Sequence, residues 1–179
     1  PPVRAVHQPL APTGFYHPLT LASLFFLFSI LGWILETLSY LTMEGVFLNR
    51  SILLGPWIPL YGICGVLSVT MLHRFAKNPI LAFCMNGLLY SVIGYLSDFT
   101  VQMIWHADLH KISQYFRPSL LPPFFADAVF LGLIGCTCQY FIAPKWKQVT
   151  RKIPLWFLLC VCVLLGMLML LDVFFAFYR

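Results

Sequence analysis

Charged residues are scarce in this chain of 179 residues. Only 9% of the residues are charged, whereas a typical soluble domain carries about 25%. The strict alternation of apolar and polar residues that marks a half-buried strand is also absent. Instead, 60% of the residues are hydrophobic and the mean hydropathy is +0.86. These features exclude an ordinary soluble domain and predict an all-α, polytopic integral membrane protein.

Several motifs are missing as well. There is no Gly-x-x-x-x-Gly-Lys-Ser/Thr loop to bind ATP phosphates, so any use of ATP would need a separate subunit. No serine lies in a nucleophile elbow, and no secretory signal is visible. The net charge of +5 comes from basic residues at helix ends, and we expect no nucleic-acid partner. The six cysteines lie within apolar runs, where we expect them to pack as small hydrophobes and not to hold a cofactor.

Long apolar runs are abundant, and each reaches the roughly 20 residues that cross a bilayer. We predict five transmembrane helices, at residues 19–43, 51–73, 79–105, 123–143 and 153–177. Residues 1–18 contain five prolines and are expected to form an extended arm. Residues 19–179 would then form a single transmembrane domain in contact with the lipid bilayer.

The basic residues predict the orientation of these helices. Five spans place the termini on opposite sides, and one side then receives seven basic residues: Arg4, Arg74, Lys77, Lys145, Lys147, Arg151 and Lys152. Since short cytoplasmic loops are enriched in Lys and Arg, this side should be cytoplasmic. We therefore expect a protein of the cell membrane with its N-terminus inside and its C-terminus outside.

Acidic residues number only six, and four of them fall inside the expected spans. These four are Glu36, Asp98, Asp127 and Asp172. An ionisable side chain at membrane depth costs at least a few kcal/mol unless it finds a partner or water. In the predicted topology all four lie near the outer ends of their helices, so they are candidates for one functional site. Interfacial snorkelling, or ion pairs with Arg50 or Lys111, is the simpler alternative.

The helix faces support the first interpretation. Residues recur at spacings of three and four, most of them small or polar, in rows that carry or adjoin the acids: Ser29, Gly32 and Glu36; Ser91, Gly94 and Asp98; Cys162, Gly166, Met169 and Asp172; and Gly132, Gly135 and Gln139 near Asp127. Small residues on one face let membrane helices approach closely, so the acids should point at other helices and not at lipid. Farther inward, only Asn86 and Gln139 extend these polar faces.

The segment from Asn49 to Gly62 is the most unusual stretch. Two prolines and two glycines lie within residues 55–62, which predicts a broken start to the second span. Irregular backbone at membrane depth is tolerated where it is buried or lines a cavity. Arg50 adds a guanidinium that binds carboxylate or phosphate, and Tyr61 adds a hydroxyl.

These residues also carry a family resemblance. Residues 28–36 ending in Glu36, the Phe-Leu-Asn-Arg of residues 47–50, and the Gly-Pro and Pro-x-Tyr-Gly of residues 55–62 are similar to the CmpB-like ABC transporter permease family. The resemblance covers residues 20–105 and implies a small multi-span membrane protein of a transporter. Asp98 stands where the family has Glu, and the family's Trp-Asp-Tyr after the third span is missing.

A metal site is conceivable in the loop after the third span. His106, Asp108 and His110 alternate, so in an extended segment they face the same way, and His and Asp are good zinc ligands. The alternative is a solvated interfacial loop.

Three functions remain open. The first is a permease-like transport component whose outer polar pocket binds a small charged or amphipathic substrate through Glu36, Asn49, Arg50, Tyr61, Asp98, Asp127 and Asp172. The second is a membrane-embedded enzyme acting on a lipid or lipid-linked substrate with a divalent metal. The third is a non-catalytic assembly subunit. A separate ATPase subunit or a second copy of the chain are the partners that we expect.

Overall fold

The computed structural model describes residues 16–45, 53, 55–105 and 123–178, and within these ranges the chain is helical without strands. The elements in chain order are α1 (Pro18–Glu44), α2 (Pro59–Met71), η1 (Leu72–Phe75), α3 (Pro79–Trp105), α5 (Pro123–Thr137), η3 (Cys138–Ile142), α6 (Ala143–Thr150) and α7 (Leu155–Tyr178). The predicted all-α class is confirmed for the part of the chain that the structure describes.

Three helices are long and apolar enough to cross a membrane. They are α1, α3 and α7, through the stretches Pro18–Ser39, Pro79–Leu96 and Leu155–Ala176. Helix α2 has 13 residues and is therefore about 20 Å long, shorter than the roughly 30 Å hydrocarbon core. The chain is thus a helical membrane protein by length and composition, and the five-span count stays a prediction.

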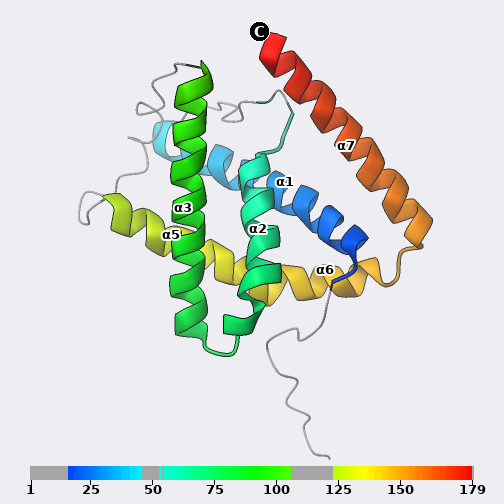
Figure 1. The fold of residues 1–179 in the computed structure, drawn as a ribbon, viewed down its shortest axis with the longest axis horizontal. Helices are drawn as coiled ribbons and strands as arrows, with labels where there is room; N and C mark the ends of the chain where they lie inside the picture. Colours follow the sequence, from blue (N-terminus) through cyan, green and yellow to red (C-terminus); the bar gives the residue numbers. More distant parts are fainter. Residues whose placement is uncertain (1–15, 46–52, 54, 106–122, 179) are drawn as a thin grey trace, which may run out of the picture.

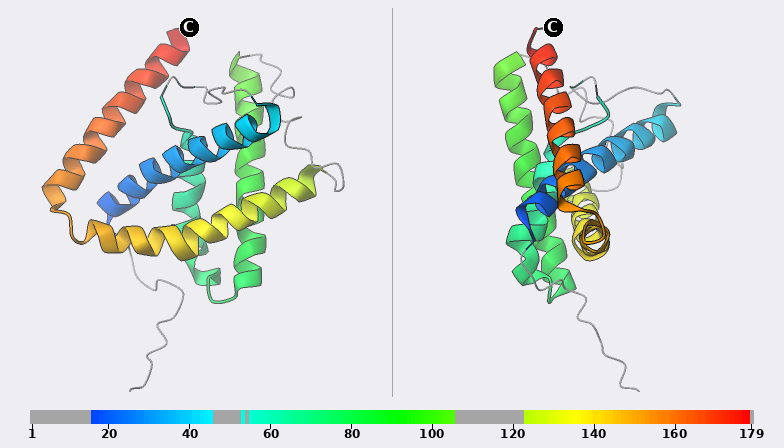
Figure 2. Two further views of the ribbon diagram at one scale, coloured as in Figure 1. Left: turned by 180° about the vertical axis from the view of Figure 1, so that it is seen from behind. Right: turned by 90° about the vertical axis from the view of Figure 1, so that its right-hand side faces the viewer.

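The helices cross one another obliquely (Figures 1 and 2). Helices α2 and α3 form an antiparallel pair joined through η1, and α1 crosses α2 while α5 crosses α3. Helix α7 stands at the edge of the molecule and packs mainly on α1. The C-terminal ends of α3 and α7 lie near the same end as the start of α2, at the top of Figure 1.

Two apolar clusters hold these crossings together. One joins Leu24 and Phe28 of α1 to Val69 of α2 and to the η3–α6 region. The other joins Phe26 of α1 to Leu158 and Cys162 of α7. Much of α7 beyond this contact is exposed, as expected of a helix that faces lipid. Helix α7 is therefore attached to the bundle mainly through its contact with α1.

Glycine sets the closest approaches between helices. A Cβ atom on Gly62 of α2 would lie 2.7 Å from the Phe25 carbonyl oxygen of α1. A Cβ atom on Gly135 of α5 would lie 2.7 Å from the Asn86 Cβ atom of α3. The predicted close packing is confirmed for the rows of Gly32 and Gly135, whereas a Cβ atom on Gly94 of α3 would meet nothing within 4 Å.

The second predicted span begins later than its apolar run suggests. Residues 55–58 are not helical, and α2 begins at Pro59 instead of near residue 51. Pro56 and Pro59 lack backbone donors and disfavour helix in the residues before them. The predicted broken start is confirmed, and the predicted helix boundary is corrected.

The fourth predicted span ends later than expected. We expected it to stop before Pro144, but the helix continues through η3 and α6 to Thr150. In η3 the spacing widens, so that the Ala143 amide donates to the Cys138 carbonyl five residues back. Pro144, which cannot donate a backbone hydrogen bond, directly follows this wider turn, and the helix continues past it.

Candidate functional site

Asp172 is a buried carboxylate on α7 with partners far away in the sequence. Its side chain is 8% exposed. One oxygen, Oδ2, accepts hydrogen bonds from the Gly55 backbone amide at 2.7 Å and from the Trp57 indole Nε1 at 2.9 Å. Both distances are typical of hydrogen bonds to a charged acceptor. The predicted inward orientation of Asp172 is confirmed.

The irregular backbone before α2 makes this contact available. The Trp57 amide donates to the Gly55 carbonyl at 2.9 Å, and the Ile58 amide donates across to the Ser29 carbonyl of α1 at 3.0 Å. Since this stretch is not helical, its amides must find acceptors outside a helix. Asp172 supplies one of them and α1 supplies another.

Glu36 of α1 binds the first turn of α2, directly after this non-helical stretch. Its Oε1 accepts a hydrogen bond from the Tyr61 hydroxyl at 2.9 Å. The Tyr61 ring lies directly on Gly32, where an added Cβ would come within 2.4 Å of the ring. Gly32, one turn before Glu36, thus leaves room for the tyrosine that reaches the carboxylate.

These contacts define a carboxylate site made of Glu36 and Asp172 with Gly55, Trp57 and Tyr61. Carboxylates from two helices bind the two ends of residues 55–61, and both are at least partly shielded from solvent. The site combines negative charge with a non-helical segment, which suits recognition of a cation or an amine.

Trp57 is a residue whose role the sequence did not reveal. Tryptophans near span ends are expected at the membrane interface, but Trp57 is 8% exposed and donates to Asp172. Its neighbours Pro56 and Pro59, which predict irregular backbone, are the signal that could have singled it out.

The other predicted site residues are only partly placed. Asp98 lies in α3 and Asp127 in α5, but their side chains lie outside what the structure describes. Asn49, Arg50, His106, Asp108 and His110 lie outside the described residues altogether, so the proposed metal ligands and the arginine contact stay predictions. Among the described residues, no group of three or more His, Cys, Asp or Glu is arranged to hold a metal.

A second polar cluster, the amide network, lies deeper in the bundle. Asn86 of α3 accepts from the Ser68 hydroxyl at 2.5 Å and donates to the Ala82 carbonyl at 2.8 Å and to Gln139 Oε1 at 3.0 Å. Gln139 in turn donates to the Leu72 carbonyl at 3.1 Å, where α2 gives way to η1. The exposed fractions of Ser68, Asn86 and Gln139 are 0%, 0% and 2%. The sequence singled out Asn86 and Gln139 but not Ser68.

Comparison with known proteins identifies the family. A family model described as "Putative ABC-transporter type IV" (CmpB) matches residues 23–177. The chain belongs to this family. The match confirms the resemblance noted over residues 20–105 and extends it through α7, so that it includes both Glu36 and Asp172. No curated protein and no solved structure matches this CmpB family member.

Proposed function

We propose that this protein is a permease-like transport component whose substrate site forms where residues 55–61 meet α1 and α7. The observation that carries the proposal is the buried Asp172 carboxylate, bound to the Gly55 amide and the Trp57 indole. A buried charge held by a non-helical segment is costly in a protein that only needs to pack. The family match supports a transport role.

The proposed ligand is a small cationic or amphipathic molecule. A cation or amine that binds Asp172 and Glu36 competes with the hydrogen bonds from Gly55, Trp57 and Tyr61. Binding would then release the two ends of residues 55–61 from α7 and α1. A ligand shifts a conformational equilibrium by its difference in affinity for the two states, and this competition supplies such a difference.

The remaining predicted residues complete the proposed pocket. Asn49 and Arg50 precede residues 55–61 in the chain, and Arg50 would bind an anionic group of the substrate or a carboxylate of the site. Asp98 and Asp127 would add negative charge from α3 and α5.

We further propose a single domain of residues 19–179 with five spans, in the cell membrane, with the N-terminus inside and the C-terminus outside. In support, the α2–α3 turn, with Arg74 and Lys77, and the α6–α7 turn, with Arg151 and Lys152, lie toward the lower end in Figure 1, whereas α3 and α7 end at the top. A separate ATPase subunit would supply energy, as the family description implies.

Thermal stabilisation of the purified chain by candidate ligands tests the proposal. We expect tetramethylammonium or a primary amine, but not acetate, to raise the melting temperature of the wild type, because a ligand of the folded state stabilises it by mass action. Asp172→Asn and Glu36→Gln should abolish the shift, and Lys77→Gln, which changes an exposed charge elsewhere, should keep it. Folded Asp172→Asn and Glu36→Gln variants with undiminished shifts would overturn the proposal.

A flux assay in vesicles extends the test to transport. Any amine that stabilises the wild type is loaded into proteoliposomes, and its release is followed with and without ATPase-containing membrane extract. We expect release to fall at least tenfold for Asp172→Asn and to be unchanged for Lys77→Gln. If the amine is chemically altered and not released, the protein is an enzyme and the transport proposal fails.

A further inference from the structure

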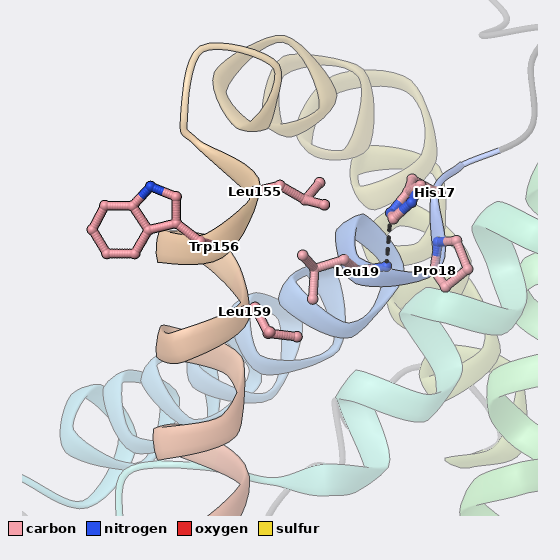
Figure 3. A pocket seen from close by; sticks show the side chains of 6 residues that line it. All are labelled: His17, Pro18, Leu19, Leu155, Trp156 and Leu159. Carbon is pink, nitrogen blue, oxygen red and sulfur yellow. Dashed lines mark hydrogen bonds between the residues drawn. The ribbon is translucent and has the colours of Figure 1, made fainter.

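An open groove lies where α7 begins beside the start of α1 (Figure 3). Its volume is about 640 Å³, and its lining is almost entirely apolar: His17, Pro18, Leu19, Leu155, Trp156 and Leu159. Leu155 and Leu159 point toward the start of α1, whereas the Trp156 ring points to the other side of α7. The groove is therefore walled by aliphatic side chains of two helices, which suits a hydrocarbon chain.

Positive charge gathers next to this groove. Arg151 and Lys152 are exposed in the turn that leads into Leu155, and Lys147 lies on the last turns of α6. Residues 128–171 contain no acidic residue, and Asp172 lies 17 positions after Leu155, about 25 Å along α7. The field at the mouth of the groove is therefore positive, and it is not neutralised within this part of the chain.

Lys147 is held in place without being neutralised. Its Nζ lies 4.6 Å from the centre of the Tyr16 ring, just before α1. Burial raises the pKa of the Tyr16 phenol above its ordinary value, so at neutral pH the ring beneath the lysine is uncharged. Arg151 lies one turn after Lys147, since its amide donates to the Lys147 carbonyl at 3.3 Å. Arg151 therefore follows Lys147 at the end of α6, and its exposed side chain adds a second positive charge there.

His17 adds a donor at the rim. Its Nδ1 accepts a hydrogen bond from the Leu19 amide at 3.3 Å, and this acceptor role places the proton of the neutral ring on Nε2. The ring is exposed, so this N–H can donate to an ester or phosphate oxygen at the mouth of the groove.

We propose that this corner binds an anionic phospholipid. Its phosphate would lie on Lys147, Arg151 and Lys152, and one acyl chain would lie in the groove between Leu19, Leu155 and Leu159. The positive charge beside an apolar groove complements an anionic lipid, since a polybasic segment next to the bilayer attracts such lipid. Lipid binding at this corner is independent of the substrate of the carboxylate site.

Native mass spectrometry of the full chain with phosphatidylglycerol and phosphatidylcholine tests the headgroup. We expect the wild type to prefer phosphatidylglycerol. Arg151→Gln with Lys152→Gln should weaken phosphatidylglycerol binding roughly 25-fold, or about fivefold for each charge. The matched control, Arg74→Gln with Lys77→Gln, removes two exposed charges at the other turn and should change binding less than twofold. Equal affinity for the two lipids, or equal losses in the two double variants, would overturn the proposal.

The acyl chain has its own test. Leu159 is 52% exposed, so Leu159→Trp should fill the groove without disturbing the core, and we expect phosphatidylglycerol binding to fall at least fivefold. The matched control is Leu164→Trp, at a residue 60% exposed on the same helix but outside the groove, and it should bind as the wild type does. Glycerol phosphate, which has no acyl chain, should not displace the lipid. Unchanged binding by Leu159→Trp, or displacement by glycerol phosphate, would contradict the site.

Discussion

The two polar clusters of this bundle differ in charge and in the backbone that they bind. The amide network of Ser68, Asn86 and Gln139 is neutral, and its hydrogen bonds run between helices and to the carbonyl at the end of α2. In the carboxylate site, by contrast, the Asp172 carboxylate binds Gly55 and Trp57, which are not helical. A neutral network that satisfies itself stabilises packing. A buried charge that depends on an irregular segment is suited to exchanging partners with a ligand.

Asn86→Leu should have the largest effect on stability. Asn86 is fully buried and connects Ser68, Ala82 and Gln139, so its removal leaves buried polar groups without a partner. We expect the free energy of unfolding to fall by about 3 kcal/mol, measured by steric trapping in bilayers. Leu88→Ala, at an exposed position of the same helix, should cost well under 1 kcal/mol. Equal losses of stability in the two variants would contradict the distinction between the buried amide network and the exposed face of α3.

Asp172→Ala should have the next largest effect. It removes the acceptor for the Gly55 amide and the Trp57 indole, and we expect a loss of about 2 kcal/mol by the same measurement. Leu170→Ala, at a residue 71% exposed on α7, is the matched control and should lie near zero. If Asp172→Ala is as stable as its control, the carboxylate does not hold the segment before α2.

Two glycine substitutions, one on α1 and one on α3, compare a tightly packed helix position with an open one. Gly32→Ala would press a methyl group into the Tyr61 ring, and overpacking of this kind costs about 1.5 kcal/mol. Gly94→Ala on α3 meets nothing within 4 Å and should be neutral or stabilising, because Ala favours helix. Thermal melting of both variants checks the difference. Equal melting temperatures would contradict the close contact between Gly32 and Tyr61.

Tyr61→Phe should have the smallest effect. It keeps the ring on Gly32 and removes only the hydroxyl that donates to Glu36, which predicts a loss of about 1 kcal/mol. Tyr95→Phe, at a residue 74% exposed on α3, should change nothing measurable. An identical response of the two variants would argue that Glu36 is held by other contacts.

Much of the fold was predictable because long apolar runs have few alternatives in a membrane. Helices α1, α3 and α7 begin and end within about two residues of the predicted spans. The orientation of Asp172 toward the other helices was predictable, because it shares a helix face with Cys162 and Gly166. By contrast, the helix through Pro144 was missed, because the wider turn at Cys138–Ile142 depends on tertiary packing and not on a local sequence signal.

The hydrogen-bond partners of the carboxylates were harder to predict than the helix faces on which the carboxylates lie. The contact between Asp172 and Gly55 spans 117 positions, and nothing local to either residue indicates it. Broken backbone near Pro56 was predictable, but which acceptors its amides would find was not. Ser68 escaped notice for a similar reason, since a lone serine on an apolar helix is common and only the position of Asn86 gives it a role.

The indole N–H resonance of Trp57 reports directly on the hydrogen bond between α7 and the segment before α2. In the full chain with ¹⁵N-labelled tryptophan, we expect Asp172→Ala to shift the Trp57 indole N–H resonance and to leave that of the exposed Trp156 in place. A Trp57 resonance unchanged by Asp172→Ala would contradict the claim that α7 holds the segment before α2 through its buried carboxylate.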